Sequence, residues 1–404
     1  MKHTIDEHVP GFEIGELFLS RTDKRGIIQS GNGVFQRLAG YEWPELIGAP
    51  HKLIRHPDMP KSAFSLLWKT IQQGLPFGAY VKNRAKDGRY YWVFAVIAPV
   101  EDGFLSVRLK PSTQFFEIIQ DLYAKMIEAE ASGASIEDCE EMVHQAVRSL
   151  GFRDYVAFMG FVLGAELVSR AGELGHAPDP SVDAFENMGQ LLVELSEEVS
   201  NVQALFEGIS SSPKNLNILG SRLSTGREAM QVIAQNYELV SNEILASIHK
   251  LSERLHALLD KAFLGRMGYC ASILYHEAIE DYRKSERHVG IRGHAEELSR
   301  LETALAEFKE AAEKGCAQIQ HEVDEFGVLT SRLRKMLSGL VVTRVVCRIE
   351  AAGSNDDTSS ITEISNRLTH FQDELGTALD RIGKACTGLS QKIPQTGKPV
   401  STAA

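Results

Sequence analysis

The sequence lacks the features that mark nucleic-acid-binding proteins and metalloproteins. Its formal net charge is −11 over 404 residues, whereas a nucleic-acid-binding surface needs a basic face. No two of its cysteines have the spacing of a metal site, and the histidines of the later helices share no ligand spacing either. We therefore expect no nucleic-acid partner, no metal centre and reduced core thiols. The cysteines are Cys139, Cys270, Cys316, Cys347 and Cys386, and the histidines of the later helices are His249, His256, His276 and His294.

The sequence also lacks a long hydrophobic run. The longest is "VAFMGFVLGA" at 156–165, about half of the roughly 20 apolar residues that cross a bilayer. The start, "MKHTIDEHVPGFEIGE", has no apolar core of the signal-peptide type. We expect a cytoplasmic protein that is not inserted in a membrane.

Residues up to about 112 combine strand and helix signals. Two short strands, "LFLSRTD" and "GIIQSGN", precede several short helices, and three strands follow: "GAYVKNRA", "RYYWVFAVIAP" and "FLSVRLKP". Asp87-Gly88 and Asp102-Gly103 are strong hairpin turns between these last strands. Asn32 suits the N-cap of "GVFQRLAG", and Asp58 can cap "MPKSAFSLLWKTIQQ". The order predicts an α+β domain, a five-stranded antiparallel sheet with helices gathered on one face.

After residue 112 the pattern becomes helical, and from about 181 it becomes heptad. Apolar residues step by three and four, a spacing near 3.5 that is typical of coiled coils, although any single stripe is also typical of a helix-bundle core. The stripes run Leu192, Leu195, Val199, Val202; then Met230, Ile233, Tyr237, Ile244; then Leu301, Leu305, Phe308, Leu333, Leu337. The predicted parts are an N-terminal domain at 1–112, linker helices at 113–180, coiled-coil hairpins at 181–263 and 264–391, and a disordered tail at 392–404.

One stretch mixes residues that a hydrophobic core alone does not need. "PHKLIRHPDMPKSAFSLLW", at 50–68, holds two histidines, an arginine, an aspartate and three prolines, and it ends on a tryptophan. With "TDKRGIIQSGNGVFQRLAGY" and "VKNRAKDGRYYWV", it resembles the PAS sensor domain of the aerotaxis receptors over about the first quarter of the chain. The resemblance implies a PAS fold, a noncovalently held FAD, and redox sensing for motility.

The resemblance also implies a set of flavin-binding positions. In the family, the residues that match Asn32, Arg55, His56, Asp58 and Trp68 belong to the flavin region. Residue chemistry adds Asn83, which offers a donor and an acceptor for a ring edge, and Trp92, which can pack on a ring. Arg55 can bind phosphate or fix a loop.

Structural roles remain open for each of these residues. Asn32 and Asp58 can be helix caps, and Trp68 can be a core residue. The sequence also departs from the family at "PFGAYVKNR", where Tyr80 adds bulk that we expect near the pocket wall. Haem is the alternative cofactor, with His51 or His56 as axial ligand.

The helical region resembles, faintly, the methyl-accepting chemoreceptor hairpin without a transmembrane anchor. "NLNILGSRLSTGREAMQVIAQNYELVSNEI" and "VVCRIEAAGSNDDTSSITEISNRL" each keep part of the receptor tip. In the family this tip contacts the chemotaxis kinase and its coupling protein, so these proteins, or other receptors, are the expected partners. A homodimer through the PAS domain or the coiled coil is also expected.

Three classes of function are weighed. The first is a cytoplasmic redox or oxygen sensor for aerotaxis or chemotaxis, which binds FAD and signals through the helix that begins near Thr113. The second is a cofactor-free PAS scaffold, or a haem-binding gas sensor. The third is an enzyme, which is not expected because the chain has neither the glycine-rich boxes of an ATP-binding domain nor a nucleophile-elbow signature.

Overall fold

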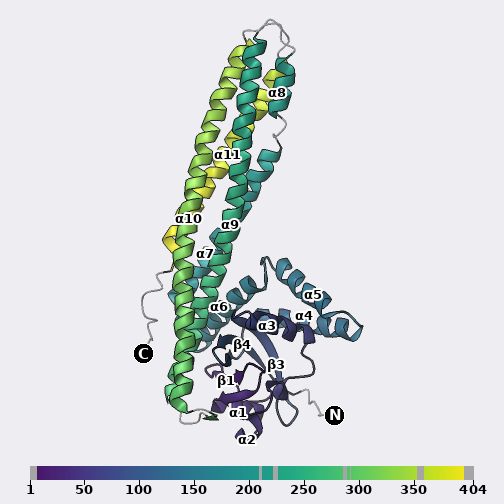
Figure 1. Cartoon of the computed structure of the whole chain (residues 1–404), viewed down its shortest axis with the longest axis vertical. Coiled ribbons are helices and arrows are strands. Elements are labelled where there is room, and N and C mark those ends of the chain that lie inside the picture. The colour runs from purple at the N-terminus through teal and green to yellow at the C-terminus, as the bar shows by residue number, and fades with distance from the viewer. Residues whose placement is uncertain are drawn as a thin grey trace. The chain divides into compact units, whose positions relative to one another are not determined.

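A computed structural model describes residues 7–208, 212–221, 226–284, 289–291, 293–352 and 359–394. The chain forms two compact units: the described part of the first comprises 7–183 and most of Phe263–Gly315, and the second comprises Ala184–Ala262 and Cys316–Pro394. Two long helices, α9 (Arg227–Lys284) and α10 (His294–Ala352), contribute to both units. They are neighbours in Figure 1. The boundary predicted after residue 263 lies inside α9, so the two predicted hairpins share one helix.

The first unit is built around an antiparallel sheet, which confirms the predicted α+β domain. Its strand order is β3-β4-β5-β1-β2-β6. The first five strands are β1 (Phe18–Asp23), β2 (Ile28–Gly31), β3 (Phe77–Arg84), β4 (Tyr90–Val100) and β5 (Gly103–Leu109). The sixth, β6 (Val289–Gly290), comes from the connection between α9 and α10 and pairs with β2. No pattern in the sequence indicates this short strand.

Short helices cover one face of the sheet, as predicted. They are α1 (Gly33–Ala39), α2 (Trp43–Leu46), the 3₁₀ helix η1 (His51–Ile54) and α3 (Lys61–Gln72). Asn32 is the N-cap of α1, because its side chain accepts a hydrogen bond from the amide of Phe35.

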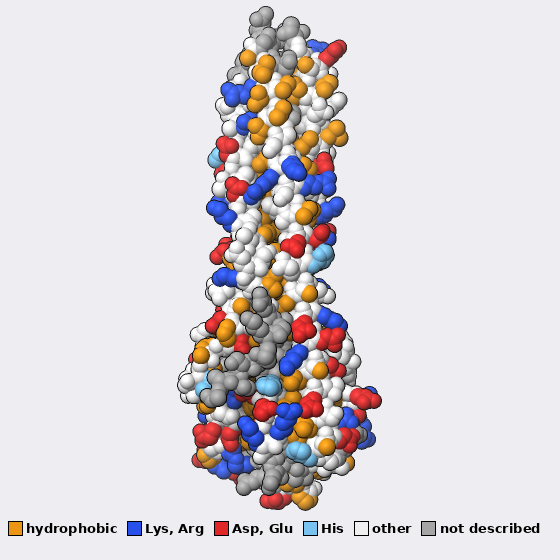
Figure 2. Space-filling model, turned by 90° about the vertical axis from the view of Figure 1, so that its left-hand side faces the viewer, with side chains coloured by type: hydrophobic (Ala, Val, Ile, Leu, Met, Phe, Trp, Pro, Cys, Tyr) orange, Lys and Arg blue, Asp and Glu red, His pale blue; other side chains and the backbone are white. Residues whose placement is uncertain are grey.

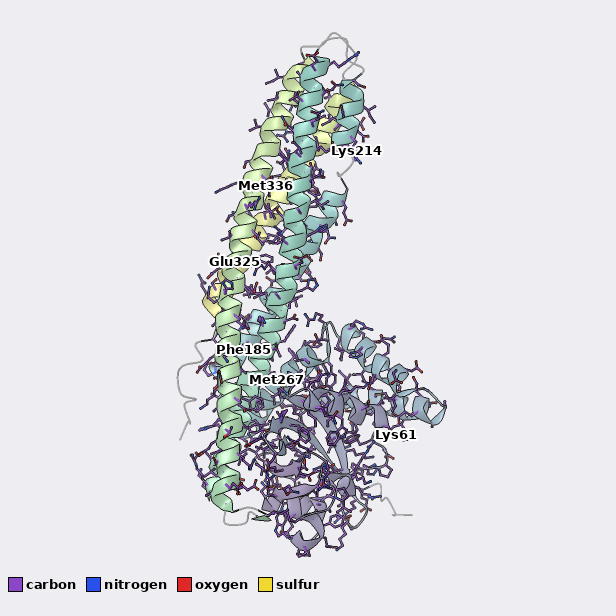
Figure 3. The ribbon with its side chains drawn as sticks, in the orientation of Figure 1. Lys61, Phe185, Lys214, Met267, Glu325 and Met336 are labelled. Carbon is purple, nitrogen blue, oxygen red and sulfur yellow. The ribbon has the colours of Figure 1, made fainter. Side chains whose placement is uncertain are left out.

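The prediction that Asp58 caps α3 is wrong. The N-cap of α3 is Pro60, and the first two amides of the helix donate instead to Glu130, at 3.1 and 2.9 Å. Asp58 lies two residues before the cap, where its carboxylate accepts from Lys82 at 2.8 Å. Glu130 belongs to α4 (Gln114–Ala131), so the helix that follows the sheet returns to support α3. Lys61, the first residue of α3, is labelled in Figure 3.

The other face of the sheet is covered by helices from beyond residue 112. They are α4, α6 (Tyr155–Glu173) and the part of α9 that belongs to this unit, with α5 (Ile136–Ser149) packed on α3 and α4. Glu166 of α6 is completely buried and accepts from the Tyr80 hydroxyl at 2.5 Å. It also accepts from the side chains of Ser112 and Thr113. This carboxylate therefore ties the end of the sheet to the start of α4.

Among the described residues, one helix is long and apolar enough to cross a membrane. This helix is α6, with a mean hydropathy of 1.2, and 56% of its apolar window is buried within the protein. By length and composition a buried core helix passes the same test, so the feature is weak support for a span.

The second unit is a helical bundle of α7 (Pro180–Glu207), α8 (Ser212–Gly220), α11 (Ser359–Lys392) and the remaining parts of α9 and α10. Figure 3 labels Phe185 on α7, Lys214 on α8, and Glu325 and Met336 on α10.

Heptad residues form the core of this bundle, which confirms the coiled-coil prediction. The buried positions include Leu192, Leu195, Val199, Val202, Met230, Ile233, Tyr237, Ile244, Leu333 and Leu337. Ion pairs cross between helices outside this core: Arg254–Glu322, Arg332–Glu243 and Arg381–Glu198. On the face that Figure 2 shows, acidic and basic side chains are interspersed along the bundle, as solvent-facing heptad positions require.

Candidate functional site

A cavity of about 280 Å³ lies between the sheet and the helices of the first unit. Its volume is close to the lower end of the range for ligand sites, roughly 300–1,000 Å³. Apolar side chains of α3 form one wall and side chains of the central strands form the other. The apolar lining includes Phe64, Leu67, Trp68, Ile71, Ile97 and Phe104. The arrangement makes a slot with aromatic and aliphatic sides.

Arg108 of β5 is a buried cation in this cavity. Its guanidinium donates to Ser20 Oγ at 2.7 Å, lies 3.1 Å from His51 Nε2, and sits over the Phe18 ring, 4.6 Å from its centroid. Within the described residues, no hydrogen bond or ion pair joins it to a carboxylate. Burial lowers the pKa of Arg108 to about 10, so it remains charged at neutral pH. A buried charge without a counter-charge is costly, and this one favours a ligand with an anionic or electron-rich edge.

His51 is held neutral beside that guanidinium. Burial, and then the charge of Arg108, lower the pKa of His51 from 6.5 to about 3. The imidazole can therefore accept a hydrogen bond from Arg108 at Nε2, a tautomer inferred from the contact. The nitrogen that would serve a haem iron is thus already engaged.

Two further polar groups of the cavity lack a partner within the described residues. They are the amide nitrogen of Asn83, a residue only 2% exposed, and the hydroxyl of Ser106. A buried polar atom left unpaired costs about 1–3 kcal/mol. A ligand that carries acceptor and donor atoms on a flat edge would remove this cost, and it would meet Asn83, Ser106 and Arg108 together.

Two other predicted residues also line the cavity. Trp68 packs edge-on against Phe104, with ring centroids 5.5 Å apart. Arg55 stacks over Phe64 at 3.7 Å, and it donates to the backbone oxygen of Met59 at 3.2 Å. With Arg55, two further cations make one part of the cavity lining positively charged: Lys52 and Arg25, whose side chain is 82% exposed. This part is suited to phosphate groups.

The structure does not bring the remaining predicted residues to the cavity lining. The side chain of Asn32 is engaged by backbone groups, since it accepts from Leu19 N at 3.0 Å and donates to Leu17 O at 2.7 Å. His56 is buried beside the cavity loop, where its Nδ1 accepts from the amide of Asp58 at 3.1 Å. Asp58 is exposed and paired with Lys82. His56 and Asp58 belong to the loop that carries Arg55, whereas Asn32 joins β1 to the start of α1.

Trp92 and Tyr80 lie on the opposite face of the sheet, so Trp92 does not line the cavity and the prediction that Tyr80 lies near the pocket wall is wrong. Trp92 packs against Phe116 and Tyr123 of α4, and Tyr80 bonds to Glu166. Side chains alternate across a strand, and both of these residues have the parity opposite to that of their cavity-lining neighbours, Asn83 on β3 and Ala95 on β4.

Sequence reasoning missed Arg108, Ser106 and Ser20. A signal for the first two was present in "FLSVRLKP", where Phe104, Ser106 and Arg108 alternate with apolar residues and therefore share one face of a strand. Two polar residues on the face that the short helices α1 to α3 cover indicate a ligand site rather than a hydrophobic core.

Comparisons with known proteins agree with this fold. A sequence model of the PAS fold matches residues 30–106. The aerotaxis receptor of Escherichia coli (strain K12) is 38% identical over 110 residues, which cover 26% of this chain and 22% of the receptor. A nitrogen fixation regulatory protein of Klebsiella pneumoniae is 31% identical over 88 residues, 22% of this chain and 18% of that protein.

A solved PAS domain of a protein from Colwellia psychrerythraea is 22% identical, covers 24% of this chain and 86% of that one, and has a TM-score of 0.21. The chain spans about a fifth of the length of the curated relatives that it matches. The N-terminal quarter of the chain is a PAS domain, similar to that of the aerotaxis receptor, and a helical region follows it.

Proposed function

We propose that the protein is a non-enzymatic, PAS-based redox sensor whose cavity binds FAD noncovalently. The observation that carries the proposal is the buried Arg108, which has no carboxylate partner within the described residues and shares an apolar slot with the unpaired Asn83 and Ser106. When bound, a flavin supplies reversible electron transfer. The similarity to an aerotaxis receptor supports this ligand class.

The residues present fit such a group in two parts. The slot between Trp68 and the strands would take the flat ring, with Asn83, Ser106 and Arg108 at its polar edge. A cavity of about 280 Å³ is too small for a whole dinucleotide. The phosphates would therefore extend past Arg55 toward the exposed Arg25 and Lys52. Haem is less well supported, because His51 is engaged by Arg108 and His56 lies outside the cavity lining.

The helical region is proposed as the output, in aerotaxis, chemotaxis or related signal transduction. The expected partners are a chemotaxis kinase and its coupling protein, other receptors, or a second copy of the chain, and the proposed location is the cytoplasm. The similarity of the PAS domain to a receptor supports the output class. Part of the second receptor-like stretch, residues 353–358, lies outside the described residues.

The experiment that tests the proposal identifies the bound molecule. The full chain is purified, any chromophore is released by denaturation, and the protein is reconstituted separately with FAD, FMN and hemin. We expect about one FAD per chain, released without covalent linkage. An Asn83→Leu variant should bind FAD about 5- to 150-fold more weakly, because one unpaired buried donor is worth roughly 1–3 kcal/mol.

Two outcomes of this experiment would contradict the proposal. One is tight binding of hemin with no binding of FAD. The other is a folded chain that binds none of the three molecules, which would favour a cofactor-free scaffold.

A further inference from the structure

The connection between α9 and α10 packs against the PAS domain's own sheet. Tyr275 of α9 is fully buried, and its hydroxyl donates to Leu105 O of β5 at 3.0 Å. Tyr282 stacks on His294, with ring centroids 4.5 Å apart, where α9 ends and α10 begins. Beyond this point, Ile291 N donates to Gln29 O at 2.9 Å, beside the pairing of β6 with β2. The segment therefore extends the sheet at its edge and covers one of its faces.

A buried ion pair fixes this contact. Arg21 of β1 donates to both carboxylate oxygens of Glu297 on α10, at 2.8 and 2.6 Å. The two side chains are 1% and 5% exposed. Ser30 of β2 donates to the same carboxylate at 3.0 Å. A buried bidentate pair is a weak source of net stability, but breaking it is costly, so such a pair can hold one arrangement of two elements.

The strand that holds Arg21 also contacts the cavity. Ser20, its neighbour, turns to the other face of the sheet and accepts from Arg108. The same alternation occurs on β5, where Ser106 and Arg108 line the cavity and the backbone oxygen of Leu105 meets Tyr275. A shift of β1 or β5 at the cavity must therefore alter the contacts with α9 and α10, because consecutive residues of one strand make both.

We propose that the Arg21–Glu297 pair is a latch, through which the state of the PAS cavity acts on α10. The α9–α10 pair then carries the signal into the second unit, to which both helices contribute residues. The sequence predicts that the signal leaves through α4. That helix, however, ends at Ala131, and Glu130 near its end accepts a hydrogen bond from the first turn of α3. The latch rests on the proposed function for its natural trigger, but its coupling exists without a ligand.

The latch can be tested in ligand-free, full-length protein with one substitution on each face of the sheet. Ser20→Ala removes the acceptor of Arg108 at the cavity, and Glu297→Gln weakens the pair on the other face. Hydrogen exchange is measured over residues 294–301 and over β5. We expect Ser20→Ala to speed exchange at 294–301 about fivefold or more. Glu297→Gln should also speed exchange in β5, because a coupling between two sites acts in both directions.

Two matched variants serve as controls. Ser106→Ala removes a cavity hydroxyl that has no partner within the described residues, and Glu302→Gln changes a partly exposed carboxylate of the same helix, which pairs with Arg283. Both should leave the remote segment unchanged. If Ser20→Ala and Glu297→Gln each affect only their own face of the sheet while the protein stays folded, the latch is refuted. That result would not contradict FAD binding, and failure to bind FAD would not refute the latch.

Discussion

Replacing Arg108 by methionine is expected to weaken FAD binding about 10- to 100-fold without destabilising the protein. A hydrogen bond to a charged group is worth about 1.5–3 kcal/mol, which corresponds to that range in dissociation constant. The ligand-free protein should keep its stability to within about 1 kcal/mol or gain some, because methionine removes a buried cation that lacks a carboxylate partner in the described part of the chain. Calorimetric titration with FAD and chemical unfolding measure the two effects.

Arg89→Met is the control for this substitution. Arg89 pairs with Asp87 in the turn before β4 and does not line the cavity, so its loss should change FAD affinity less than about threefold. The role assigned to Arg108 would be wrong if Arg108→Met bound FAD normally. It would also be wrong if that variant lost several kcal/mol of stability, since Arg108 would then be a structural residue.

Replacing Glu166 by alanine is expected to cost about 3 kcal/mol of stability. The change leaves the buried hydroxyl of Tyr80 and the half-buried donors of Ser112 and Thr113 without their common acceptor, and an unpaired buried polar group costs about 1–3 kcal/mol. Burial, and then the charge of Glu166, raise the pKa of Tyr80, so its hydroxyl carries a proton that would lose its acceptor. For a unit of this size the melting temperature should fall by about 6–12 °C.

Glu173→Ala, at the exposed end of the same helix, should change stability by less than about 0.5 kcal/mol. Glu166→Gln should fall between the two, because the amide keeps one acceptor oxygen but turns a donor toward other donors. Equal melting temperatures for Glu166→Ala and Glu173→Ala would show that the cluster at the start of α4 does not hold the sheet and the helix together.

Local patterns were sufficient to predict the five-stranded sheet and the coiled coil. Hairpin turns at Asp87-Gly88 and Asp102-Gly103 fix neighbours in sequence, and heptads repeat the same contact many times. The packing of the α9–α10 connection on the sheet has no such local signal. Arg21 and Glu297 are far apart in the chain, and each reads as an ordinary surface charge until the fold buries both.

The candidate site was predictable only in part, for the same physical reason. Residues that match the aerotaxis-receptor pattern include Arg55 and Trp68, which line the cavity, and also Asn32 and Asp58, which instead bond to backbone groups and to Lys82. Residue type does not separate the two roles, because an asparagine that caps a helix and one that faces a ligand look alike in sequence. Strand parity is more informative: it excludes Trp92 and it indicates Arg108.

Hydrogen exchange in the full-length, FAD-loaded protein, oxidised and then reduced without oxygen, tests the sensor most directly. We expect reduction to change protection at the cavity strands and also in residues 114–131, 263–284 and 294–301. The free energy of ligand contacts must differ between the two states for any signal to pass. If flavin reduction altered protection only within the strands and helices that line the cavity, the helical region would be a passive attachment, and the sensor account would be contradicted.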